Sequence, residues 1–79
     1  MQFMITYEIG PENRTASGKR FQKTGGLPPK GVTMLARWHK SAGLGGWVVC
    51  ESSSAEAIAD WMYQWNDLLR FDVEPVIND

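Results

Sequence analysis

The sequence predicts a single α+β domain of 79 residues, in which four strands and two helices follow the order strand, helix, strand, strand, helix, strand. Three observations predict this class. Residues 2–9 alternate apolar and polar side chains, which is the period of a strand. Residues 53–69 instead repeat apolar side chains at helical spacing. Glycine and proline gather between such stretches, above all in residues 25–31, and mark loops.

The first strand is expected over residues 2–9, and Gly10-Pro11 ends it. A weaker helix follows to about residue 24, with Asn13 as its expected N-cap. A glycine inside a helix costs about 1 kcal/mol relative to alanine. We therefore expect Gly18 to have a structural purpose, namely to let this helix lie close on the sheet.

Two strands joined by a hairpin are expected next, over residues 32–40 and 46–52. Turn chemistry explains the glycines of residues 43–46. The preceding loop is not predicted to hold phosphate. Its Pro28 and Pro29 lack the backbone N–H groups that a phosphate-binding loop supplies.

The helix over residues 53–69 is the best-defined element. Ser53 and Glu56 predict a capping box at its start. Its apolar stripe consists of Ile58, Trp61, Met62, Trp65, Leu68 and Leu69. Tryptophans at this spacing are more often core residues than a cofactor platform. The last strand is expected over residues 70–77, where Pro75 indicates a position at the sheet edge.

This element order is the split β-α-β pattern of ferredoxin-like folds, and it forms one domain over residues 1–79. Right-handed crossovers place both helices on one face of a four-stranded antiparallel sheet. The other face is also expected to carry apolar side chains, since both alternation sets of the middle strands contain them. These sets are Met34, Ala36 and Trp38 against Leu35, and Val48 and Cys50 against Trp47 and Val49. A second copy of the chain is the simplest cover, so we expect a homodimer.

Composition and charge exclude several function classes. A net charge of −1, from eight basic and nine acidic residues, is atypical of a nucleic-acid binder. No apolar run reaches the roughly 20 residues of a membrane span, and residues 1–9 do not form a signal peptide, so a cytoplasmic protein is expected. One cysteine and one histidine exclude a disulfide and a zinc site. No cofactor motif is present, and we expect none to be bound; Cys50 is expected in the core.

The candidate ligand-binding residues lie on the strands: Tyr7, Arg37, Trp38, His39, Trp47 and Glu51. Arg37 and His39 are two residues apart and therefore share a sheet face. If that face bounds a pocket, arginine suits a carboxylate head group and histidine suits proton transfer near neutral pH. The aromatic neighbours would meet the apolar body of the ligand. The alternative is that Arg37 pairs with Glu51 across the hairpin and His39 is solvated at the strand end.

Three stretches of the sequence carry a resemblance to a known family. They read QFMITYEI-P-NR from residue 2, F--TGG-PP-GV-ML-RWH from residue 21 and W---WNDLL-F-V-PV from residue 61, with residues 37–39 and 65–69 the most specific. Nearly the whole chain resembles a family of small bacterial proteins that carries only a domain-of-unknown-function label. That family is similar to the dimeric α/β-barrel superfamily.

The resemblance implies two ferredoxin-like sheets, one from each copy, packed face to face as a barrel. Distant relatives in that superfamily include cofactor-free monooxygenases, isomerases, haem-handling enzymes and ligand-sensing domains. None of their catalytic motifs can be placed on residues of this sequence. Ser17-Gly18 departs from the larger apolar residues that we would expect in the first helix.

Two function classes remain from the sequence. In the first, a small dimeric α/β-barrel protein binds a small apolar or aromatic carboxylate in a sheet-lined cavity, with or without catalysis. In the second, the chain is a protein-interaction module that docks on a larger assembly without catalysis. Its docking surface would lie near Leu44 or on the outer helix faces.

Overall fold

A computed structural model describes all of residues 1–79. Its elements are β1 (Gln2–Ile9), the 3-10 turn η1 (Pro11–Asn13), α1 (Arg14–Thr24), β2 (Thr33–His39), β3 (Gly45–Glu51), α2 (Ala55–Tyr63) and β4 (Leu69–Val76). The predicted order of strands and helices is confirmed. Each strand begins and ends within one residue of its expected boundary.

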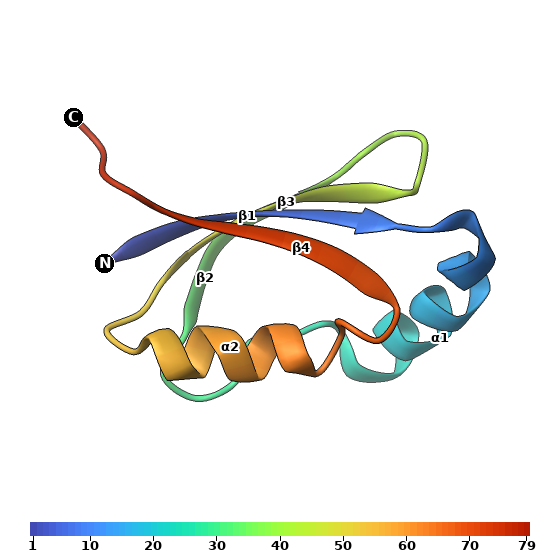
Figure 1. The fold of residues 1–79 in the computed structure, drawn as a ribbon, viewed down its shortest axis with the longest axis horizontal. Coiled ribbons are helices and arrows are strands. Elements are labelled where there is room, and N and C mark those ends of the chain that lie inside the picture. The colour runs from blue at the N-terminus through green and yellow to red at the C-terminus, as the bar shows by residue number, and fades with distance from the viewer.

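The four strands form one antiparallel sheet in the order β2-β3-β1-β4, with both helices on the same face (Figure 1). This arrangement is compatible with a ferredoxin-like fold. All buried residues of the strands lie on β1 and β3, which are also the two central strands of the sheet. Pro75 lies in β4, which is an edge strand as its missing N–H predicts.

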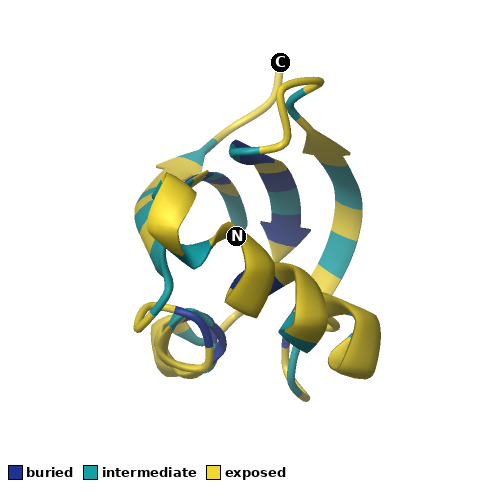
Figure 2. Ribbon diagram, turned by 90° about the vertical axis from the view of Figure 1, so that its right-hand side faces the viewer, coloured by how far each residue is buried: buried dark blue, intermediate teal, exposed yellow.

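The core lies between β1, β3 and α2. Ile5 and Cys50 are fully buried in the middle of the sheet, where Figure 2 shows the dark bands of buried residues. Trp61 and Trp65 are buried against them, which confirms that these tryptophans belong to the core. Cys50 is a core residue as well, as expected.

Two details of the predicted helix 53–69 are wrong. The N-cap is Ser54, whose hydroxyl oxygen accepts a hydrogen bond from Ala57 N at 3.1 Å, so Ser53 and Glu56 form no capping box. The helix also ends at Tyr63, and turns continue to residue 68. Beyond Tyr63 the backbone bonds tighten to i→i−3, since Trp65 N donates to the Met62 carbonyl and Leu68 N to the Trp65 carbonyl.

The first helix also differs in two details from the sequence prediction. Asn13 occupies the N-cap position but makes no capping hydrogen bond; its side-chain amide donates to the carbonyl of Leu68 instead. Gly18 is exposed, and an added Cβ would meet no atom within 4 Å. The expectation that Gly18 brings the helix close to the sheet is therefore wrong.

A β-bulge in β2 changes which side chains share a face. Met34 pairs with Cys50 and Ala36 with Val49, so the extra residue between them shifts the alternation. Met34 thus lies on the helix-covered face, although simple alternation placed it with Ala36 and Trp38. Alternation holds after the bulge.

The other face of the sheet is uncovered within this chain. Trp38 and Trp47 lie directly opposite each other on it, with 55% and 40% of their surface exposed. Ala36, Val49 and Met4 continue the same face across β2, β3 and β1. The uncovered face is therefore apolar over β2 and β3 and becomes polar over β1 and β4, where Thr6, Glu8 and Asp72 continue it.

Candidate functional site

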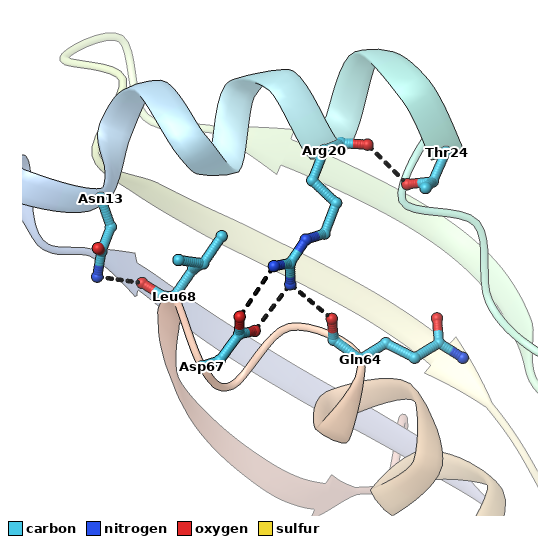
Figure 3. A network of polar contacts seen from close by, with 6 residues as sticks. All are labelled: Asn13, Arg20, Thr24, Gln64, Asp67 and Leu68. Carbon is cyan, nitrogen blue, oxygen red and sulfur yellow. Dashed lines mark hydrogen bonds and ion pairs between the residues drawn. The ribbon is translucent and has the colours of Figure 1, made fainter.

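Helix α1 is held in place mainly by polar contacts. The Arg20 guanidinium donates two hydrogen bonds to the Asp67 carboxylate, at 2.7 and 2.8 Å, and a third to the carbonyl of Gln64 at 2.9 Å (Figure 3). It also lies 5.5 Å from the centre of the Trp65 ring. Ser17 is the only buried residue of α1. The helix is thus fastened along one side to the turn before β4, and it need not pack tightly on the sheet.

Two adjoining hollows lie between α1, α2 and the helix-covered face of the sheet. The inner one, of about 60 Å³, reaches the core, and the outer one, of about 360 Å³, lies between α1 and the β2–β3 hairpin. Both are lined by Tyr7, Phe21, His39, Trp65 and Leu69. We call the two hollows together the α1 cleft.

Tyr7 and His39 are hydrogen-bonded within the cleft, through the Tyr7 Oη and His39 Nδ1. Phe21 meets the His39 ring edge-on, with the centroids 5.7 Å apart and the planes at 89°. Burial raises the pKa of the Tyr7 phenol above its ordinary value, and the nearby positive charge of Arg37 offsets part of that rise. The phenol is therefore protonated throughout the physiological range.

Arg37 lines the inner hollow, but its guanidinium is already engaged. It donates to the carbonyls of Gly26 and Gly25 at 2.9 and 3.0 Å, just after the end of α1. Its central carbon also lies 4.9 Å from the centre of the Phe21 ring. A cation here suits the negative end of the helix dipole. Arg37 thus fixes the loop after α1 and adds positive charge to the cleft.

Arg14 is a cleft residue that the sequence analysis did not single out. It lines the outer hollow, and its guanidinium forms no hydrogen bond or ion pair within the chain. Arg14, Ser17, Gly18 and Phe21 follow the spacing i, i+3, i+4, i+7, and all four line that hollow. This helical spacing was the signal that could have identified it.

The six candidate residues are divided between the two faces of the sheet. Tyr7, Arg37 and His39 come together in the α1 cleft, whereas Trp38, Trp47 and Glu51 lie on the uncovered face. The alternative pairing of Arg37 with Glu51 is wrong, since Arg37 lies opposite Val48 and on the other face.

Other groups are less suited to chemistry. Burial raises the pKa of the Cys50 thiol, which lies in the core away from the cleft. No three of the chain's histidine, cysteine, aspartate and glutamate side chains are grouped so that they could hold a metal ion. Neither helix has the length and apolar character needed to cross a membrane.

The hairpin tip does not offer the exposed leucine that the interaction-module reading considered. Leu44 is partly buried, and its carbonyl accepts a hydrogen bond from Ile9 N at 3.1 Å. The hairpin is therefore fastened to the end of β1 and forms one wall of the cleft.

Comparison with known proteins places the chain in a family. A search of curated proteins finds no match to it. The model of the family described as "Domain of unknown function (DUF3303)" matches residues 1–79, the whole chain. The protein therefore belongs to the DUF3303 family.

Proposed function

We propose that this protein binds a small apolar or aromatic carboxylate in the α1 cleft. The observation that carries the proposal is the charge of the lining. Arg14 and Arg37 contribute positively charged groups to the two hollows, His39 contributes a ring nitrogen, and no aspartate or glutamate lines either of them. The chain as a whole carries a net charge of −1, so this local excess of positive groups is not a consequence of composition.

The remaining lining suits an apolar ligand body. Aromatic and aliphatic side chains from both helices and the sheet form the walls, among them Phe21, Trp65 and Leu69. The outer hollow, at about 360 Å³, falls within the range of roughly 300–1,000 Å³ that is usual for small-molecule sites. A ligand with its ring or chain toward Trp65 would bring its carboxylate to Arg14 at the rim.

A screen of matched ligands tests the proposal. Aromatic and fatty carboxylates are compared with the amines and alcohols of the same carbon skeleton, by native mass spectrometry and thermal shift. Carboxylates should bind best. Arg14→Gln should weaken their binding, whereas Lys19→Gln, on an exposed position of the same helix outside the cleft, should not.

A second variant locates the site. Gly18→Leu places a side chain in the outer hollow, where the structure leaves open space. It should abolish binding while α1 stays folded, as circular dichroism would report. Carboxylates that bind both variants as tightly as the wild type would contradict the cleft as the site.

We also propose that the uncovered sheet face is covered by a second copy of the chain, as in a dimeric α/β barrel. The support is the exposed pair Trp38 and Trp47, which lies in an apolar surface over β2 and β3. A small domain also leaves much of its surface unburied when alone, and association offsets this.

Sedimentation tests the dimer. We expect a species of about twice 8.9 kDa at micromolar concentration, and a thermal midpoint that rises with protein concentration. Trp38→Glu should give monomers, whereas Tyr63→Glu, at an exposed aromatic residue of α2, should not. A wild-type monomer would contradict the dimer and favour the second function class, an interaction module docking on a larger assembly.

A further inference from the structure

The Tyr7–His39 hydrogen bond crosses a strand that lies between its two partners. Tyr7 is on β1 and His39 on β2, and β3 separates these strands in the sheet. Both residues are in register with Gly46 of β3. A Cβ on Gly46 would lie 2.6 Å from the Tyr7 Oη, so only glycine leaves room for this contact.

The direction of the hydrogen bond follows from the burial of Tyr7. The phenol is buried, and His39 Nδ1 is its only hydrogen-bond partner in the chain. If Nδ1 carried a proton, the Tyr7 proton would have no acceptor within the chain. Leaving a buried hydroxyl without an acceptor is unfavourable, because the group has given up its hydrogen bonds to water. The arrangement in which Tyr7 donates and Nδ1 accepts is the one that gives the phenol proton a partner within the chain.

This direction decides which nitrogen of His39 faces the ligand as a donor. A neutral imidazole carries one N–H, so when Nδ1 accepts, the proton is on Nε2. Nε2 lies on the far side of the ring from the Tyr7 contact, and it has no hydrogen-bond partner in the chain. The ring itself is exposed and lines both hollows of the cleft.

We propose that His39 acts through Nε2–H as the hydrogen-bond donor that selects an oxygen acceptor on the ligand, with Tyr7 as the positioning residue that holds this tautomer. The inference rests on the proposed function, since it concerns the same cleft. It assigns His39 to recognition and not to proton abstraction, because a nitrogen that already carries a proton cannot take another from the ligand. Arg14 supplies the positive charge that attracts the carboxylate, and the His39 N–H orients one of the ligand's oxygen atoms.

Nitrogen NMR tests the tautomer without any ligand. His39 is the only histidine, so its two ring nitrogens give the only imidazole signals of a 15N-labelled sample. In mildly alkaline buffer, Nε2 should show the protonated-type shift and Nδ1 the unprotonated type. Tyr7→Phe should shift both signals toward a mixture of tautomers. A protonated Nδ1 in the wild type, or no change in Tyr7→Phe, would overturn the proposal.

Matched substitutions test the recognition role, with 2-naphthoate and decanoate as probes. Glutamine can place an N–H donor near the position of Nε2, whereas asparagine can place one only near Nδ1. His39→Gln should therefore retain binding within about threefold, and His39→Asn should weaken it by about tenfold or more. Circular dichroism would check that both variants fold.

The two proposals fail in distinguishable ways. If both probes bind the wild type and the two His39 variants bind them equally well or equally poorly, the role of Nε2–H is overturned while the carboxylate site stands. If neither probe binds the wild type at millimolar concentration, the proposed ligand class and the recognition role are both overturned.

Discussion

Arg20 and Asp67 join helix α1 to the turn after α2 through a bidentate ion pair, although 46 residues lie between them in the chain. The pair connects the middle of α1 to the turn that follows α2 (Figure 3). Each group shifts the other: the pKa of the Arg20 guanidinium is raised and that of the Asp67 carboxyl is lowered, chiefly by their hydrogen bonds. Since α1 buries little apolar surface, this pair and the Arg20 bond to the Gln64 carbonyl are its main polar contacts with the second half of the chain.

The first prediction is that acid loosens α1. The pKa of Asp67 is lower in the folded state than its ordinary 3.8. Its contribution to stability is therefore present above that ordinary value and is lost as the pH falls through the folded value. Urea unfolding between pH 7 and 2 should show a decline below about pH 4 that is smaller in Asp67→Asn. An unchanged acid slope in that variant would count against the role of the ion pair.

The second prediction concerns the start of α2. Ser54→Ala removes the hydroxyl that caps Ala57 N and should destabilise the fold by about 1 kcal/mol. Ser53→Ala is the matched control, because Ser53 is exposed and forms no cap; it should be nearly neutral. Chemical denaturation of the two variants gives the comparison, and equal losses would contradict the assignment of the cap.

The third prediction compares two glycines. Gly18→Ala should stabilise the protein by up to about 1 kcal/mol, because the new methyl group enters open space within a helix. Gly46→Ala should instead destabilise it by about 1–3 kcal/mol, because its methyl group would overlap the Tyr7 ring and the Trp38 carbonyl. Thermal midpoints measured at one protein concentration should move in opposite directions.

The fourth prediction is a loss of stability in alkali. Burial raises the pKa of Tyr7 above its ordinary 10.0. The unfolded chain thus releases this proton first, so stability is complete below about pH 10 and declines as the pH rises toward the folded value. Cys50 acts in the same direction from its ordinary 9.0. Unfolding free energies from pH 8 to 11 should fall less steeply in Tyr7→Phe than in Tyr63→Phe, and equal slopes would contradict the role of Tyr7.

The sequence by itself determined the element order, the identity of the core and the edge position of β4. Strand alternation, the helical spacing of Trp61 and Trp65, and the missing N–H of Pro75 are local signals, and each depends only on neighbours along the chain. They also placed Arg37 and His39 on one face, because a period of two needs no tertiary information.

Only the tertiary structure decided which groups meet. Three features depend on elements that are distant in sequence. The bulge places Met34 opposite Cys50, Arg20 donates a hydrogen bond to the Gln64 carbonyl after α2, and Arg37 donates to the carbonyls after α1. Turn chemistry accounts for the glycines of the hairpin in the sequence, but only the structure shows that Gly46 leaves room for Tyr7 to reach His39. Such contacts depend on register between strands and on the position of α1, which local periodicity does not encode.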